Sequence, residues 1–210
     1  MQTSPQPRRD SAFPGPEERD RERRQKREAV LRTAAALFCT RGYNATQMSD
    51  VARQLGVTKP TIYYYFKNKE EVLVACFEGG FDLIEATMAQ ADMQARSGAD
   101  RLRGALYAYA EIMTTELGKC AALIPTNELS DENQKRIIAH RRRYDSGIRT
   151  LVAEAIADGS IRPCDPKIAT FSVLSGLNGL ARWHRPDGKL PPAELARTVV
   201  DQLFAGFEKR

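Results

Sequence analysis

Several features that enzymes and membrane proteins need are missing from this chain of 210 residues. Its four cysteines and two histidines stand singly, without the close spacing of a metal or redox site. It contains no GxSxG, P-loop or HExxH motif. No run approaches the roughly 18 apolar residues of a membrane span, and the opening MQTSPQPRRD lacks the apolar stretch of a secretion signal. We therefore expect a cytoplasmic protein that is not an enzyme, needs no metal or cofactor and does not associate with membranes.

The alternation of polar and apolar residues that marks β-strands is also missing. Apolar residues instead recur with helical spacing, and most of the gaps between these segments hold glycine or proline. The expected helices are residues 21–41, 46–55, 58–66, 68–93, 102–117, 131–157, 166–183 and 192–207. The sequence predicts an all-α fold, with Thr46 and Thr58 capping the second and third helices.

Positive charge is concentrated near the N-terminus. Residues 1–70 hold 14 Lys and Arg against 8 Asp and Glu, whereas the whole chain has a net charge of only +5. Residues 1–20, rich in proline, are expected to be a disordered basic tail. We assign residues 21–70 to a three-helix DNA-binding domain, because Lys and Arg neutralise phosphates, and residues 71–210 to a larger helical domain.

The second and third expected helices have the arrangement of a DNA-binding helix-turn-helix, with a short turn at Gly56 between them. The second helix of such a motif places its N-terminal residues in the major groove. Lys59 can donate to guanine, while Pro60 and Thr61 can touch thymine methyl groups. Candidate DNA contacts are Thr46, Thr58, Lys59, Pro60, Thr61, Tyr63, Tyr64, Tyr65 and Lys69.

Three tyrosines and a phenylalanine, residues 63–66, follow this tip. One helix cannot bury four successive residues on one face, so at least two of them should be exposed. Ile62 and Phe66, four residues apart, are expected to face the core. The tyrosines should then point toward sugars and phosphates, where a phenol offers a flat ring and one hydroxyl.

The stretch AALFCTRGYNATQMSDVARQLGVTKPTIYYYFKNKEEVL resembles the N-terminal domain of the TetR family of bacterial transcriptional regulators. By this resemblance, the nine candidate residues occupy positions that touch DNA in the family. Ser49 departs from the pattern, since many members carry a longer basic or polar residue there, so a base contact from the second helix is left open. The resemblance also implies a C-terminal domain that dimerises and holds a small ligand.

The last two expected helices are the predicted dimer interface. The first carries small residues that permit close approach, and the second carries an apolar residue at every fourth position. The residues concerned are Ser172, Ser175, Gly176, Gly179, Leu195, Val199, Leu203 and Phe207.

The segment LNGLARWHRPDGKLPPAELA, with GKCAAL and RRRYDSGIRTLVAEAIADGSIRPCDP, resembles a TetR subgroup that responds to acyl-CoA thioesters. We expect Arg182 to pair with a ligand carboxylate or phosphate and Trp183 to stack on a ring. Alternatively, Trp183 packs in the protein and Arg182 is a surface charge. The run of residues 140–143, His-Arg-Arg-Arg, is expected to be a solvated face with one or two inward residues, although CoA phosphates would also suit these arginines.

Two functions remain open from the sequence. The first is a ligand-responsive repressor, released from a palindromic operator by a small molecule such as an acyl-CoA thioester of lipid, sterol or aromatic-acid catabolism. The second is an architectural DNA-binding or interaction protein of the same fold, whose helical half contains no pocket. A cavity in that half would distinguish the first from the second.

Overall fold

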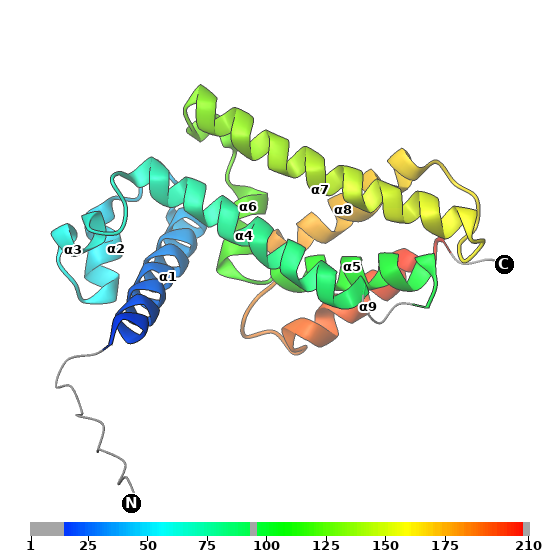
Figure 1. Cartoon of the computed structure of the whole chain (residues 1–210), viewed down its shortest axis with the longest axis horizontal. Helices are drawn as coiled ribbons and strands as arrows, with labels where there is room; N and C mark the ends of the chain where they lie inside the picture. Colours follow the sequence, from blue (N-terminus) through cyan, green and yellow to red (C-terminus); the bar gives the residue numbers. More distant parts are fainter. Residues whose placement is uncertain (1–14, 93–95, 208–210) are drawn as a thin grey trace, which may run out of the picture.

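The computed structural model describes residues 15–92 and 96–207, and every regular element in these ranges is helical (Figure 1). The elements are α1 Pro16–Arg41, α2 Met48–Leu55, α3 Lys59–Tyr63, α4 Lys69–Asp92, α5 Gly98–Ile112, α6 Glu116–Leu123, the 3-10 turn η1 Thr126–Glu128, α7 Asp131–Ala157, α8 Pro166–Trp183 and α9 Pro192–Phe204. The all-α prediction is confirmed. None of the helices in these ranges is long and apolar enough to cross a membrane.

Helices α1, α2 and α3 pack at one end of the molecule, and α4 leads from them into the helices of the other end (Figure 1). The face of α1 that bears Val30, Ala34 and Phe38 is buried there against α2 and α4. Ile62 fixes α3 to the same core because its side chain is fully buried. The apolar stripe found in the sequence is therefore the face that holds the N-terminal helices together.

The first helix begins earlier than predicted. It starts at Pro16, so Pro16 to Asp20 belong to α1 and not to a disordered tail. Proline suits the first turn, where its missing N–H leaves no bond unmade, and Glu17 and Glu18 favour the positive end of the helix dipole. Residues 1–14 of the predicted tail lie outside the described residues.

Two helices end three residues earlier than predicted. Helix α3 ends at Tyr63 instead of residue 66, and α9 ends at Phe204 instead of residue 207. In both places a buried phenylalanine, Phe66 or Phe207, lies in the irregular segment that follows. Burial of each ring favours ending its helix. The weak helix propensity of the aromatic residues 64–66 adds to this in α3, and that of Gly206 adds to it in α9.

Helix α6 was not predicted, because the sequence pattern runs one helix through residues 102–117. In the structure, the Thr115 hydroxyl donates to the Ile112 carbonyl at 2.8 Å, where α5 ends. The same hydroxyl accepts from the Gly118 N–H at 3.1 Å and so caps α6. Gly118 is required at this corner, since a Cβ atom there would clash with the Ile112 carbonyl.

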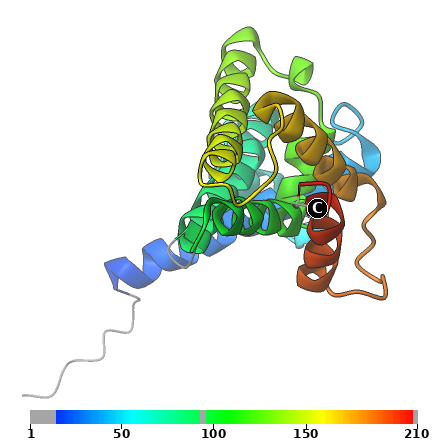
Figure 2. The ribbon, with the colours of Figure 1, turned by 90° about the vertical axis from the view of Figure 1, so that its right-hand side faces the viewer.

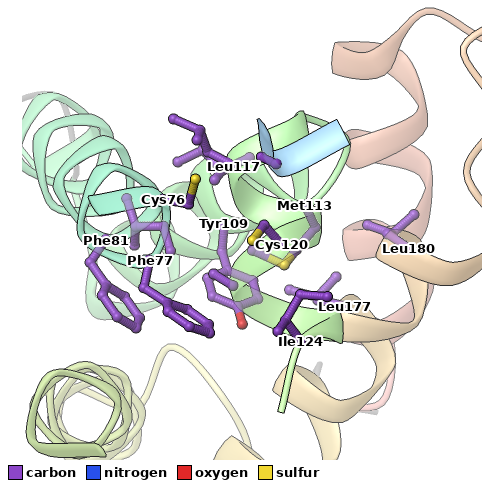
Figure 3. Packing of buried hydrophobic residues seen from close by; sticks show 14 of the residues in the cluster. Cys76, Phe77, Phe81, Tyr109, Met113, Leu117, Cys120, Ile124, Leu177 and Leu180 are labelled. Carbon is purple, nitrogen blue, oxygen red and sulfur yellow. The ribbon is translucent and has the colours of Figure 1, made fainter. Parts of the chain in front are cut away.

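Side chains of several helices converge around α6 (Figure 3). Cys76 and Phe77 come from α4, Tyr109 from α5, Cys120 from α6 and Leu177 from α8, and all are buried. Contact with Cys120 and burial hold the pKa of the Cys39 thiol far above its ordinary value. The prediction that the cysteines are free thiols is confirmed, although three of them meet here despite their separation in the sequence.

The Gly118 corner can be tested by Gly118→Ala. We expect the free energy of unfolding to fall by roughly 1–3 kcal/mol, because the added methyl group forces the α5–α6 corner apart. Urea denaturation followed by circular dichroism measures the change.

Gly147→Ala is the matched control. Gly147 lies inside α7, and a Cβ atom there would meet nothing within 4 Å. This substitution should stabilise the protein by roughly 0.5–1 kcal/mol through helix propensity alone. Equal changes in the free energy of unfolding of the two variants would contradict the close packing at the α5–α6 corner.

Candidate DNA-binding and ligand-binding sites

Gly56 sets the angle between α2 and α3. It adopts the left-handed conformation, with φ of 66°, and ends α2 there. The next N–H, of Val57, donates to the Ala52 carbonyl at 3.0 Å, which closes the end of α2. Because the Ile62 side chain of α3 is buried, the first turn of α3 faces the solvent, as the predicted helix-turn-helix requires.

The predicted tip of α3 is exposed. Thr58, Lys59, Pro60 and Thr61 all lie at the surface, and Pro60 occupies the first turn as expected. The hydroxyls of Thr58 and Thr61 are hydrogen-bonded to each other at 2.9 Å. Thr58 therefore stands at the capping position, but its hydroxyl does not cap the helix.

The four successive aromatic residues divide between core and surface, but Tyr65 is more buried than predicted. Phe66 is 2% exposed, whereas Tyr63 and Tyr64 are 41% and 69% exposed. Tyr65 is half-buried, and its ring meets the edge of the Tyr64 ring at 5.0 Å between centroids. At least two exposed tyrosines were expected, and this is confirmed.

Thr46 does not have its predicted role. Its side chain is 1% exposed, and its hydroxyl lies 2.8 Å from the Gly42 carbonyl and 3.3 Å from that of Leu37. Gln47, not Thr46, precedes α2 as its cap residue. The Thr46 hydroxyl is thus used to hold α1 against the start of α2, so a side-chain contact to DNA is not open to it.

Lys69 begins α4 as predicted, but it is half-buried. Its ammonium group lies 4.0 Å from the centre of the Tyr43 ring. Burial lowers the pKa of Lys69, and the Glu128 carboxylate opposes this shift. Lys69 therefore stands at the junction between the two halves of the protein, and its contact with a DNA phosphate stays a prediction.

Hydrogen bonds tie this junction to the second half. The Asn44 amide donates to Glu128 of η1 at 2.9 Å. Glu70, in the first turn of α4, accepts from Asn133 and from the Ser130 N–H, both at 2.8 Å. These bonds hold the pKa of Glu70 below its ordinary value. The DNA-binding helices are consequently held by the segment that starts α7.

A cavity of about 280 Å³ lies between helices α4, α5, α6, α7 and α8. Its apolar walls are Phe81, Ile84, Met113, Ala121, Ala122, Phe171 and Leu174. Its polar groups come from Tyr109, Arg141, Tyr144, Asp145, Ser175 and Asn178. Apolar walls combined with several convergent polar groups are found in small-molecule sites.

Two stacked tyrosines form one side of the cavity. The rings of Tyr109 and Tyr144 lie 5.0 Å apart, and the Tyr109 hydroxyl donates to Asn178 at 2.5 Å. The Tyr144 hydroxyl is buried and has no hydrogen-bond partner among the described residues. Burial raises the pKa of both phenols, so each keeps its proton near neutral pH. Tyr144 thus offers an unused donor to a ligand.

A cation, Arg141, and a carboxylate, Asp145, lie beside the two tyrosines in the cavity wall. The Arg141 guanidinium donates to the Ala121 carbonyl at 2.7 Å and lies 5.6 Å from the centre of the Phe77 ring. Burial lowers the pKa of Arg141. Burial also raises the pKa of Asp145, against the opposing effect of the neighbouring arginines. The cavity is therefore lined by both a cation and a carboxylate.

The predicted ligand residues lie elsewhere. Arg182 and Trp183 are exposed at the end of α8 and are not part of the cavity wall. Of the run 140–143, Arg141 points inward and Arg143 pairs with Glu85 of α4, as expected for a solvated face with an inward residue. Tyr109, Tyr144 and Asn178 come from three separate helices with no shared motif, so sequence pattern alone did not find them.

Comparison with known proteins decides the family. Residues 30–76 match the family model described as bacterial regulatory proteins, tetR family. Residues 95–207, more than half of the chain, match the model described as tetracyclin repressor-like, C-terminal domain. The chain belongs to the TetR family. It is a DNA-binding transcriptional regulator, as the sequence predicts.

Individual relatives agree with this TetR assignment. The transcriptional repressor KstR2 of Mycolicibacterium smegmatis is 25% identical over 87% of this chain and 90% of its own. The structure of PfmR from Thermus thermophilus aligns with a TM-score of 0.74 and 31% identity, covering 86% of this chain and 99% of PfmR. AibR, crystallised with isovaleryl coenzyme A and operator DNA, aligns with a TM-score of 0.73 and 29% identity over 85% of this chain and 98% of AibR.

The unused Tyr144 hydroxyl leads to a prediction for the ligand-free protein. Tyr144→Phe should leave the free energy of unfolding unchanged or raise it, because it removes a buried polar group that has no partner. Tyr109→Phe is the matched control, since it leaves the Asn178 side chain without its bond and should cost about 1 kcal/mol. Urea denaturation of both variants measures this; a larger loss for Tyr144→Phe than for Tyr109→Phe would contradict it.

Proposed function

We propose that this TetR-family protein is a homodimeric repressor that a short-chain acyl-CoA thioester releases from a palindromic DNA operator. The observation that carries the ligand proposal is the cavity with its unpartnered Tyr144 hydroxyl. This cavity also favours a ligand-responsive repressor over an architectural protein of the same fold, because a filled interior would be expected for the latter.

The cavity suits the acyl end of such a molecule. Its volume of about 280 Å³ lies just below the range of drug-sized ligand sites, about 300–1,000 Å³, and suits a small group. An acyl chain would lie against Phe81, Ile84 and Leu174. The thioester carbonyl would accept a hydrogen bond from the Tyr144 hydroxyl. The complex of AibR with isovaleryl coenzyme A supports a short branched or straight chain.

The nucleotide part of CoA does not fit in the same volume and would lie outside the cavity. Phe171 and Ser175 of α8 are exposed and line the cavity, so they mark its mouth. Arg182 follows Asn178 by one helical turn on the same side of α8 and is exposed. Arg182 thus keeps its proposed role as a partner for a ligand phosphate. Trp183 lies on another side of α8, and we assign it to the dimer.

The dimer proposal rests on exposed apolar side chains. Ile168 and Trp183, near the two ends of α8, are 65% and 53% exposed, and large apolar side chains left open in this way favour a covering partner. We propose that α8 and α9 of two copies pack together, so that two α3 helices reach successive major grooves. In this arrangement residues 21–70 form the DNA-binding domain and residues 71–210 the ligand-binding and dimerisation domain.

The ligand proposal predicts a thermal shift. Isovaleryl-CoA or butyryl-CoA at about 100 times Kd should stabilise the native protein by about 2.7 kcal/mol and raise Tm by roughly 5–10 °C. Coenzyme A alone and free isovaleric acid should give smaller shifts. Tyr144→Phe should reduce the shift while the ligand-free Tm stays at or above that of the wild type. Absence of a shift with every thioester would exclude this ligand class.

Lys59 provides the test of the DNA contact. Its side chain is exposed at the tip of α3, so Lys59→Ala should weaken operator binding by roughly 1–3 kcal/mol and relax the base preference at one position. Fluorescence anisotropy with operator variants measures both effects. Lys135→Ala, an exposed lysine of α7, makes the same charge change far from α3 and should leave binding intact. Equal loss in both variants would contradict the placement of α3.

A further inference from the structure

The first turns of α1 bury nothing. Residues 16–29 are all exposed, and the first buried side chain of the helix is that of Val30. These 14 residues extend α1 by about 21 Å at 1.5 Å per residue. Figure 2 shows this part of α1 projecting from the rest of the molecule. We call residues 16–29 the arm.

The two faces of the arm carry different sets of charged residues, and one of them is basic. Arg19, Arg23, Lys26 and Arg27 have the i, i+4, i+7, i+8 spacing of a single face, which Val30 continues into the core. Asp20 borders this face. Glu22 pairs with Lys26 at 3.2 Å, but both side chains are exposed and the ion pair is therefore weak.

The other face of the arm is mixed in sign. Glu17, Arg21, Arg24 and Glu28 share a face through their i, i+4, i+7, i+11 spacing. Glu28 also pairs with Arg32. The two faces of the arm therefore differ in charge although they belong to one short stretch of helix.

The basic face lies on the side of α3. The Arg23 guanidinium is 5.7 Å from the centre of the Tyr64 ring, and that of Arg27 is 4.9 Å from the centre of the Phe66 ring. An open hollow lies between the arm and this end of α3, lined by Arg19, Asp20, Glu22, Arg23, Lys26, Tyr64 and Tyr65. The cations thus stand beside the most exposed of the large apolar and aromatic side chains, Tyr64 at 69%.

We propose that the arm binds the phosphate backbone of operator DNA, with Arg19 and Arg23 contacting phosphates beside the base pairs that α3 reads. This inference rests on the proposed DNA-binding role of α3. Arginine pairs well with phosphate oxygens, and the exposed Tyr64 hydroxyl beside it is a further donor to them.

The composition of the arm favours DNA over a protein partner. Apart from Pro16 and Ala29 it holds no apolar residue, whereas the core of a protein interface is apolar and poor in charge. Charge-driven contact with a polyanion needs no such core, because it gains free energy from the release of counterions. Such contacts add affinity for any sequence but carry no base preference.

The test compares two double variants of the full chain. Arg19→Ala/Arg23→Ala removes two charges from the basic face, and Arg21→Ala/Arg24→Ala removes the same charge from the mixed face of the same helix. All four residues are exposed, so both variants should keep the wild-type Tm. The probe is a duplex that the wild-type protein enriches from a random-sequence pool, and its Kd is measured between about 50 and 200 mM salt, a range over which phosphate contacts change affinity strongly.

We expect the slope of log affinity against log salt to become shallower by about 1.8 for the basic-face variant, at about 0.9 per phosphate contact, with a loss of affinity of roughly tenfold or more. The mixed-face variant should keep the wild-type slope. The basic-face variant should enrich the same duplex from the pool, since backbone contacts carry no base preference.

Equal slopes for wild type and both variants would overturn the arm proposal while leaving DNA binding by α3 intact. Equal loss in the two variants would overturn it too, because general charge and not the basic face would then be responsible. A changed base preference in the basic-face variant would assign the arm to bases instead of phosphates. If the wild-type protein enriches no duplex, the proposed function itself fails.

Discussion

Close packing of α6 against α1 and α4 is the contact on which the arrangement of the two halves depends. A Cβ atom on Gly80 of α4 would lie 3.3 Å from the Leu117 carbonyl and 3.4 Å from the Ala121 Cβ, so small side chains let the backbones of α4 and α6 approach closely. On its other side α6 meets α1, where Cys39 contacts Cys120. Ala121 and Ala122 of the same short helix line the cavity. This two-turn helix therefore contacts α1 of the DNA-binding end and also lines the proposed ligand site.

Polar contacts reinforce this link along α4. Glu70 at its start is held by Asn133 and the Ser130 N–H, and two ion pairs, Glu78 with Arg136 and Glu85 with Arg143, continue along α7. The ion pairs lie at the surface, with only Glu78 half-buried, and contribute little individually, whereas the two hydrogen bonds to Glu70 fix where α7 begins. Helix α4 is thus held by α6 through apolar packing and by α7 through polar contacts. Both helices also contribute to the cavity wall.

Sequence patterns predict those parts of the protein in which neighbouring residues determine the outcome. The spacing of Val30, Ala34 and Phe38 indicates the buried face of α1, and the turn at Gly56 with Pro60 beyond it indicates the helix-turn-helix. Helix α6 was missed because Thr115 makes the break at which it starts, while the prediction relied on glycine and proline. Thr46 was misassigned because its partners, the carbonyls of Leu37 and Gly42, are known only once α1 and α2 are placed.

The cavity residues were still harder to predict from sequence patterns. Its tyrosines and Asn178 come from α5, α7 and α8, and only the tertiary fold brings them together. Arg182 and Trp183 were predicted from the resemblance of their segment to acyl-CoA-responsive regulators, yet neither lines the cavity wall.

The length of α1 has a mechanical consequence. Its 26 residues form one uninterrupted rod of about 39 Å, with Cys39 against α6 near one end and the arm at the other. A tilt of about 5° around the α6 contact would displace the far end by about 3 Å, which is close to the length of a hydrogen bond. A helix of this length converts a small angular change at the α6 contact into a movement large enough to break contacts with a rigid partner.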